Sequence, residues 1–130
     1  MSFWRDSDDW VVAYDPKRQP YCLLLGGKNW SFELDHFEMK SLVNLLATLN
    51  TQWQASLTEI MDEETLSCVV GGEYVEIERF GTAQAFGLRL RLLGGRKAEG
   101  IWENGGAVWQ VLDQLLLHLA SQVTMEMPKP

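Results

Sequence analysis

The sequence of 130 residues predicts an α+β fold with two antiparallel β-sheet-plus-helix units related by a pseudo-two-fold axis. Two long segments repeat apolar residues at helical spacing, and a series of short β-rich runs precedes each of them. The pentapeptide Leu-Leu-Gly-Gly-Lys at 24–28 is echoed by Leu-Leu-Gly-Gly-Arg at 92–96, in the same place within each half. We therefore expect one domain over 1–130 that contains an internal duplication of roughly 4–62 and 63–120.

The first half contains three clear β-rich runs, which lie at 10–14, 21–25 and 30–34. A turn bounded by two prolines separates the first two runs, and Gly26-Gly27 forms a tight turn before the third. In the third run apolar and polar residues alternate, which is the period of a half-buried strand. These segments predict an antiparallel meander, and the stretch near Phe3–Arg5 is a candidate for a further N-terminal strand.

A long amphipathic helix is expected after this meander. Asp35 is a good N-cap residue, and Glu38 completes a variant of the capping box. The apolar stripe then follows at steps of three and four residues: Leu42, Leu46, Leu49, Trp53, Leu57 and Ile60. We expect the helix to end near Asp62-Glu63-Glu64, because carboxylates at a helix C-terminus oppose the macrodipole.

Four strands and a second helix are expected in the second half. The strands are predicted at 66–70, 73–80, 85–93 and 98–103. Their connections are short and contain glycine, so sequential antiparallel pairing is the simplest topology. The apolar face of the second helix is predicted to comprise Val108, Val111, Leu112, Leu115, Leu116 and Leu119. The expected order is therefore β-β-β-α-β-β-β-β-α, and 121–130 are expected to form a flexible tail.

Composition and charge narrow the class of protein. Eighteen acidic residues against eleven basic ones give a formal charge of -7, which disfavours a protein that coats nucleic acid. Cys22 and Cys68 lie in separate apolar stretches, so we expect buried reduced thiols and not a zinc or redox motif. The N-terminus is too polar for a signal peptide, and no apolar run approaches the roughly 20 residues of a membrane span. These features predict a cytoplasmic location.

No pattern in the sequence indicates catalysis, a cofactor or a metal ion. His36 and His118 lie far apart and lack the spacing of a metal-binding or catalytic motif. There is no Gly-x-Ser-x-Gly elbow, and neither Gly-Gly turn has the pattern of a phosphate-binding loop. The acidic runs 6–9 and 62–64 lack EF-hand spacing and are expected to be solvated turns. We predict that the protein is not an enzyme and uses no cofactor.

A cluster of basic residues contrasts with the acidic whole. It comprises Arg79, Arg89, Arg91, Arg96 and Lys97, with no acidic residue between them. As an anion or nucleic-acid surface, this cluster would use Tyr74 and Trp102 to stack bases. Alternatively, the arginines of the 85–93 strand pair across the hairpin with Glu76 and Glu78. The positions of the glutamates, which share the face of these arginines, favour pairing.

Three apolar residues are candidates for a protein-interaction surface. Trp4 lies in a polar N-terminal stretch. Leu117 interrupts the polar face of the second helix, and together with Trp109 it suggests a protein–protein contact. A single exposed leucine is also ordinary on a protein surface. A homodimer and a different protein partner both remain open.

Several segments together resemble a small cyanobacterial family of unknown function. They are 10–14, Leu24–Lys28, Trp30–Leu34, Ile60–Glu64, and Arg89–Arg96 with Ala98–Trp102. The resemblance covers roughly residues 4–120. It implies a fold like that of the Whirly and transcriptional-coactivator group of single-stranded-DNA-binding proteins, in which two four-stranded sheet-plus-helix units are related by a pseudo-two-fold. It supplies no functional residues.

Two classes of function follow from these observations. The net charge favours a non-catalytic protein-interaction or accessory/assembly module, and the resemblance implies a setting in a photosynthetic bacterium. The alternative is a single-stranded nucleic-acid-binding regulator that uses the basic strand face. The arrangement of charges distinguishes the two. A continuous basic face would favour the nucleic-acid binder, whereas interleaving with Glu76, Glu78 and Glu99 would favour the interaction module.

Overall fold

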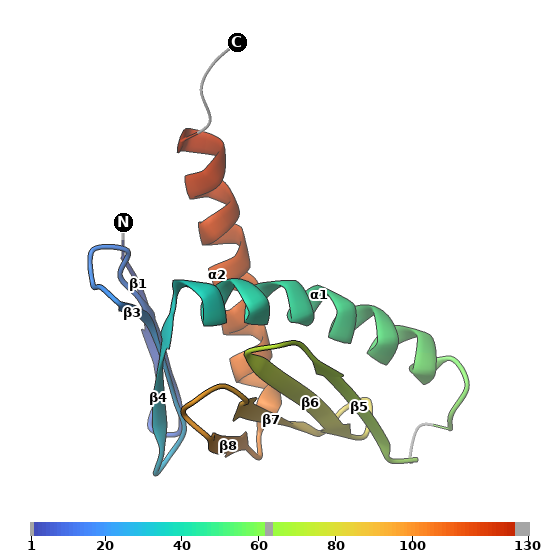
Figure 1. The fold of residues 1–130 in the computed structure, drawn as a ribbon. Helices are drawn as coiled ribbons and strands as arrows, with labels where there is room; N and C mark the ends of the chain where they lie inside the picture. Colours follow the sequence, from blue (N-terminus) through green and yellow to red (C-terminus); the bar gives the residue numbers. More distant parts are fainter. Residues whose placement is uncertain (1, 62–63, 127–130) are drawn as a thin grey trace.

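Two four-stranded antiparallel sheets, each followed by a long helix, make up the computed structural model of the chain (Figure 1). The structure describes residues 2–61 and 64–126, the last six of these by their backbone only. Sheet A contains, in spatial order, β1 (Phe3–Asp6), β2 (Val11–Tyr14), β3 (Tyr21–Gly26) and β4 (Ser31–Asp35). Sheet B contains β5 (Leu66–Gly71), β6 (Val75–Gly81), β7 (Phe86–Leu92) and β8 (Ala98–Trp102). Helix α1 spans His36–Leu57, and helix α2 spans Gly105–Glu126.

This architecture confirms the predicted α+β fold and its two-unit repeat. Every predicted strand is present, and its ends lie within two residues of the predicted ones. The candidate N-terminal strand is present as β1, which pairs antiparallel with β2. Both copies of the Leu-Leu-Gly-Gly echo end the third strand of a sheet and enter the turn to the fourth. The two halves are therefore equivalent in their topology.

The start of α1 is fixed by a capping box. The carboxylate of Asp35 accepts the backbone N–H of Glu38 at 2.8 Å, and the carboxylate of Glu38 accepts the N–H of Asp35 at 2.9 Å. The first N–H groups of a helix have no partner within the helix, so this exchange satisfies groups that would otherwise need water. The predicted N-cap is confirmed.

The end of α1 comes earlier than the sequence predicted. The last helical residue is Leu57, and the hydroxyl of Thr58 after it donates to the carbonyl oxygen of Ala55 at 2.8 Å. The predicted end near 62–64 is therefore wrong. Trp53 is the last fully buried residue of the apolar stripe, so packing against the core does not extend the helix further. Residues 62 and 63 themselves lie outside the described residues.

Helix α2 extends beyond its predicted apolar face. Residues 121–126, which were expected to begin a flexible tail, continue the helix, and 127–130 lie outside the described residues. His118 therefore lies inside α2 and not in its last turn. Its ring instead packs against Phe3 and Tyr14 of sheet A, with centroids 5.6 and 6.2 Å apart.

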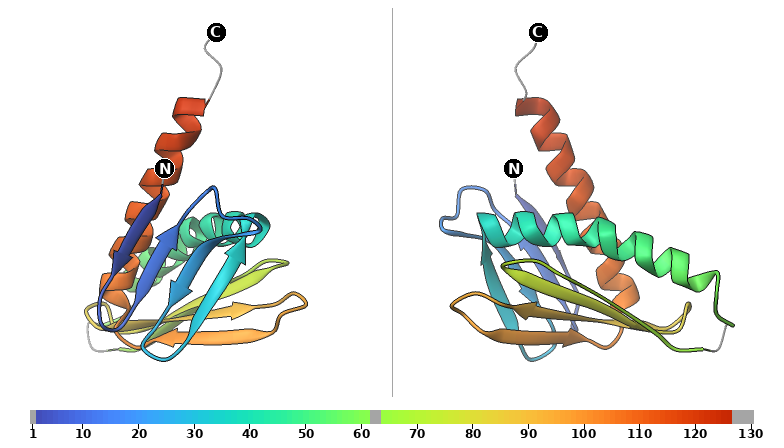
Figure 2. Two further views of the ribbon diagram at one scale, coloured as in Figure 1. Left: turned by 90° about the vertical axis from the view of Figure 1, so that its left-hand side faces the viewer. Right: turned by 45° about the vertical axis from the view of Figure 1, so that its right-hand side comes forward.

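Each helix packs against strands of both sheets. Helix α1 packs against β5 and β6 of sheet B as well as against β3 and β4, and α2 packs against β7 and β1. Figure 2 shows α1 lying across one face of sheet B, while the C-terminal part of α2 projects beyond both sheets. Each helix therefore contributes apolar side chains to both halves.

Because each helix contacts both sheets, the protein has a single hydrophobic core. Its fully buried side chains come from both sheets and both helices, and the largest include Leu23, Leu25, Leu34, Leu42, Leu49, Trp53, Ile77, Leu88, Leu90, Leu112 and Leu115. Complete burial of one such side chain contributes about 2 kcal/mol relative to leaving it in water. The two halves share this contribution, so their stabilities are coupled.

The two units also meet through a reciprocal pair of tryptophans. Trp30, in the turn before β4, donates its indole N–H to the carbonyl oxygen of Ile101 at 3.1 Å. Trp102, at the end of β8, donates its indole N–H to the carbonyl oxygen of Gly26 at 2.9 Å. The two rings are tilted, with centroids 4.8 Å apart. We call this contact the tryptophan junction.

The tryptophan junction depends on a glycine. The ring of Trp30 lies so close to the backbone of Gly100 that a Cβ atom there would come within 2.5 Å of ring carbons. No side chain other than hydrogen fits at this distance, because packed interiors do not compress. Gly94, in the turn before β8, is the opposite case, with nothing within 4 Å of the corresponding Cβ position.

We expect Gly100→Ala to lower the free energy of unfolding by about 1–3 kcal/mol, since Trp30 must move to admit the methyl group. Urea denaturation followed by circular dichroism measures this change. Gly94→Ala is the matched control and should change stability by no more than about 0.5 kcal/mol. Equal losses in the two variants would contradict the close approach of Trp30.

Candidate functional site

The outer face of sheet B carries a ladder of alternating charges, which we call the charge ladder. Arg89 lies 2.7 Å from Glu78 and 2.9 Å from Glu99. Arg91 lies 2.5 Å from Glu76 and 3.4 Å from Glu99. Glu99 on β8 therefore joins both arginines of β7, which in turn reach the glutamates of β6.

The arginines of the charge ladder are neutralised by these contacts. The strand register places Glu78 opposite Arg89 and Glu76 opposite Arg91, which confirms the predicted cross-strand pairs. Hydrogen bonding to Glu76 is the largest cause of a raised pKa of Arg91. Three carboxylates surround two guanidinium groups, so the ladder is interleaved and is not the continuous basic face that nucleic-acid binding would use.

Arg79, which the sequence assigned to the basic surface, is buried in the core with 6% of its surface exposed. It pairs with Leu88, on the face of sheet B that the leucines occupy. Its guanidinium carbon lies 3.7, 4.4 and 4.7 Å from the ring centroids of Phe86, Trp53 and Trp109. The assignment was wrong because Arg79 is one residue out of phase with the charge ladder, and adjacent residues of a strand face opposite sides.

The aromatic box formed by Trp53, Phe86 and Trp109 encloses the Arg79 cation, and the carboxylate of Asp113 adds an electrostatic attraction. The Nε atom of Arg79 is buried and has no hydrogen-bond partner among the described residues. Burial lowers the pKa of Arg79 to about 10, so the group keeps its charge at neutral pH. A desolvated cation over a ring face gains about 2 kcal/mol. The box therefore fastens β6 to both helices.

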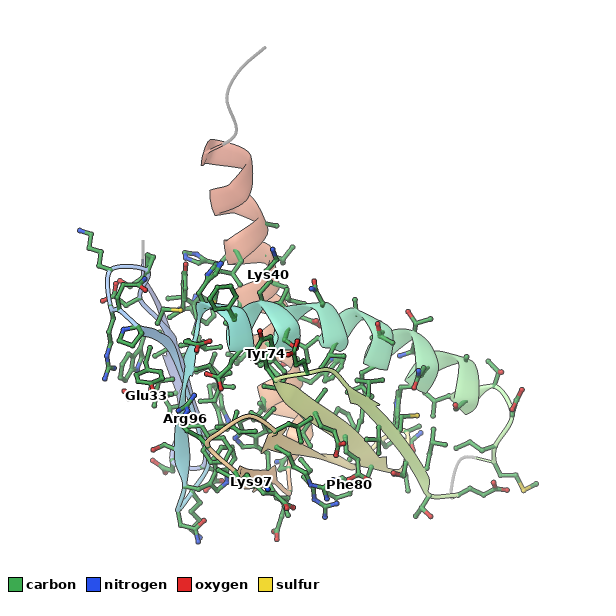
Figure 3. All side chains as sticks on the ribbon, in the orientation of Figure 1. Glu33, Lys40, Tyr74, Phe80, Arg96 and Lys97 are labelled. Atoms are coloured by element: carbon green, nitrogen blue, oxygen red, sulfur yellow. The ribbon has the colours of Figure 1, made fainter. Side chains whose placement is uncertain are left out.

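Arg96 and Lys97, the remaining basic candidates, lie in the turn between β7 and β8 (Figure 3). Arg96 donates to the carboxylate of Glu38 at 2.5 Å and to the carbonyl oxygen of Glu33 at 2.8 Å, and it also lies over the ring of Tyr21. These contacts tie the second unit to the N-terminus of α1. Lys97 is exposed, and within the described part of the chain it forms no ion pair.

Of the two predicted stacking residues, Tyr74 is exposed and Trp102 is not. Trp102 is 4% exposed and belongs to the tryptophan junction, so it is not available to stack a base. Its facing could not be read from the sequence; the register places it opposite Leu88, on the core face. Tyr74 is 38% exposed and stacks on Phe37 of α1, with ring centroids 6.5 Å apart.

The three candidates for an interaction surface do not form one surface. Trp4 on β1 is 59% exposed, and Leu117 on α2 is 73% exposed. Phe3 packs against α2, and Trp4, its neighbour in the strand, faces the opposite side of sheet A. Trp109 is half-buried, and its ring lies over the guanidinium of Arg79 in the aromatic box.

An exposed apolar patch that the sequence reading missed lies where α1 meets the turns of sheet B. It comprises Phe37, Tyr74 and Leu93, and we call it the aromatic patch. Phe37 is 65% exposed and Leu93 is 40% exposed. The backbone N–H of Leu93 donates to the carbonyl oxygen of Tyr74 at 2.9 Å, which holds the two turns together. The available signal was Phe37 itself, a large apolar residue outside the helix stripe.

A cleft of about 640 Å³ opens beside the tryptophan junction. Its walls come from the β1–β2 loop, the β3–β4 turn, β8 and the connection from β8 to α2. The residues that give it chemical character are Asp9, Trp10, Lys28, Trp30, Ile101 and Glu103. These residues come from both halves of the chain and form no local sequence motif, so the cleft could not be predicted from the sequence.

Metal-binding and redox features are limited in the part of the chain that the structure describes. No group of three or more histidine, cysteine or acidic side chains is close enough to hold a metal ion there. Cys22 and Cys68 are buried free thiols, and burial raises the pKa of Cys22. No described helix is both long and apolar enough to cross a membrane. The acidic run 62–64 lies partly outside the described residues.

Comparison with known proteins places the chain in a family. Residues 5–121 match the family model of a domain of unknown function, DUF1818. The chain belongs to this family. A crystal structure of a protein of unknown function from Prochlorococcus sp. NATL2A, described as a member of the DUF155 family, is similar in fold with a TM-score of 0.73. Its sequence is 24% identical, and the match covers 93% of this chain and 98% of the other. A search of curated proteins gave no match.

Arg79→Ala should lower the free energy of unfolding by about 3 kcal/mol, because it removes the cation from the aromatic box and leaves a cavity. Arg18→Ala is the control: this arginine is exposed and pairs with Glu33 at the surface, so its loss should cost less than about 1 kcal/mol. Chemical denaturation of both variants measures the difference. Similar losses would show that the box does not stabilise the fold.

Proposed function

We propose that this member of the DUF1818 family is a non-catalytic, cytoplasmic protein-interaction module that binds a protein partner through the aromatic patch. The observation that carries the proposal is the exposure of three large apolar side chains at one place, Phe37, Tyr74 and Leu93. Exposed apolar patches on soluble domains mark contact sites, because burying them on association gains free energy.

The framework beneath the aromatic patch supports this role. Phe37 is the second residue of α1 and lies between Asp35 and Glu38, the two residues of the capping box that fixes the start of the helix. Gly72, in the turn that holds Tyr74, lies so close to α1 that a Cβ there would be 3.2 Å from the Ser41 hydroxyl. The patch is thus held on a well-fixed framework, which lowers the entropy cost of binding.

The rim of the aromatic patch favours a partner with acidic groups around an apolar side chain. Lys40 is one helical turn after Phe37, and Figure 3 shows it above Tyr74 where α1 crosses the β5–β6 turn. Lys97 lies in the same turn as Leu93, and Glu73 is the acid next to Tyr74. The charge of Lys40 beside the aromatic pair therefore favours an acidic group on the partner.

Single-stranded nucleic acid is the second candidate ligand for the same surface. The stacked rings of Phe37 and Tyr74, with Lys40 beside them (Figure 3), are groups that could stack a base and contact a phosphate. The two-sheet, two-helix repeat is consistent with the resemblance to the Whirly group, and we propose that relationship for the fold. The net charge of -7 and the neutralised charge ladder favour the protein partner.

The combined substitution of Phe37→Ser and Tyr74→Ser tests the proposal. We expect recovery of the partner from native lysate to fall at least about tenfold, because loss of two central aromatic contacts removes more than 1.4 kcal/mol of binding energy. The matched control replaces two other exposed apolar residues, Met61→Ser with Val69→Ser, and should retain the partner. Affinity purification with quantitative mass spectrometry measures recovery.

Three results would contradict parts of the proposal. Equal loss of the partner in the control variant would show that the patch is not the contact. Loss of the partner only in the double variant Trp4→Ser with Leu117→Ser would show that the partner binds at those residues and not at the aromatic patch. Recovery that depends on nucleic acid, and disappears after nuclease treatment, would favour the nucleic-acid-binding regulator. Light scattering of the purified protein identifies the case in which the partner is a second copy of the chain.

A further inference from the structure

The cleft beside the tryptophan junction is lined by aromatic ring faces and carboxylates. Trp10 and Trp30 are half-buried in its wall, and Ile101 is 39% exposed. The indole N–H of Trp30 is already donated to Ile101, and Gly100 and Trp102 pack against the ring, so a ligand can contact only the part of this half-buried ring that faces the cleft. The face of an indole is its negative part and attracts cations.

The charges around the cleft point to a positively charged ligand. Three carboxylates line it, on Asp9, Glu99 and Glu103, against one lysine, Lys28. Glu99 is shared by the two arginines of the charge ladder. Asp9 and Glu103 are exposed and form no ion pair with any residue that the structure describes. An anionic ligand would be repelled here, whereas an ammonium or guanidinium group would be attracted.

The size and shape of the cleft favour an extended segment over a small free cation. The cleft is larger than one side chain requires. A second hollow of about 470 Å³ shares Glu103 and Asn104 with it and continues toward Phe80 and Gln84. The two hollows therefore follow one another along the connection from β8 to α2, and an extended chain could occupy both.

We propose that this cleft binds an extended segment of a partner protein through a lysine or arginine side chain, which lies against the rings of Trp10 and Trp30 and pairs with Asp9 and Glu103. The site is separate from the aromatic patch in both residues and chemistry. Neither proposal requires the other, so a failure of one leaves the other to be judged by its own experiment.

Nuclear magnetic resonance titration of the full chain tests this proposal. The probes are two acetylated and amidated pentapeptides, Gly-Arg-Gly-Arg-Gly and Gly-Glu-Gly-Glu-Gly. We expect the arginine peptide to shift the indole N–H signals of Trp10 and Trp30 and the amides of 99–104 in a saturable way. The glutamate peptide should leave these signals unchanged.

Two variants connect the shifts to the proposed groups. Asp9→Asn with Glu103→Gln should weaken binding of the arginine peptide about fivefold, since two surface ion pairs are lost. Trp10→Leu keeps an apolar side chain but removes a ring face, and should weaken binding about threefold. The control, Glu59→Gln with Glu64→Gln, changes the net charge equally near the C-terminal end of α1, away from the cleft, and should bind within about twofold of the native chain (Figure 1).

Two outcomes would overturn the proposal. If both double variants weaken binding equally, the peptide is attracted only by the overall negative charge of the protein. If the shifted signals lie outside the cleft, or the glutamate peptide binds equally well, the site is not selective for cations. Should the first double variant prove unfolded by circular dichroism, Asp9→Asn alone and Trp10→Leu decide the matter with the same titration.

Discussion

The tryptophan junction is the contact on which the arrangement of the two units depends. Trp30 and Trp102 each donate an indole hydrogen bond to the backbone of the opposite unit, and their rings pack on one another. Hydrogen bonds are directional, so each bond also fixes the angle at which a ring enters the contact. The absence of a side chain at Gly100 lets Trp30 come this close. The cleft beside the junction and the contact of Arg96 with the start of α1 both follow from this placement.

Most of the basic cluster predicted in the second unit is bound by other groups of the fold. The arginines of β7 are bound within the charge ladder, Arg96 is bound to Glu38 and the backbone, and Arg79 is enclosed by aromatic rings. Basic residues that a sequence presents as a cluster are thus separated in space into four different environments, one of which is the exposed Lys97. What the surface then offers a partner is chiefly apolar area at the aromatic patch and uncompensated carboxylate at the cleft. Both favour protein ligands over a phosphate backbone.

The sequence was sufficient for features that depend on period and local chemistry. The strands, the capping box of α1 and the pairing of Glu76 and Glu78 with the β7 arginines follow from alternation, N-cap preference and parity. It was insufficient where one residue of register decides the outcome, as for Trp102, or where tertiary packing overrides local preference, as at the end of α1. Arg79 alternates with the glutamates of β6, so its position in the strand already indicated the core face. A charged residue is nevertheless expected at the surface, and only the three-dimensional structure shows the aromatic rings that enclose it. The cleft joins four distant segments, so the fold must be known before it can be seen.

The duplicated Leu-Leu-Gly-Gly turn shows how the two copies have come to differ. In the first copy both glycines are required by packing: a Cβ at Gly26 would meet Val11 at 2.8 Å, and one at Gly27 would meet the Trp30 ring at 2.3 Å. In the second copy, Gly94 and Gly95 have nothing within 4 Å of the same position. The glycines of the first turn are therefore required by the packing around the tryptophan junction, which holds the units together. The second turn is free of that constraint, and it is the one that contributes Leu93 and Lys97 to the exposed surface. Substitution of Gly94 or Gly95 should therefore cost the fold little, whereas substitution of Gly26 or Gly27 would disturb the contact between the halves.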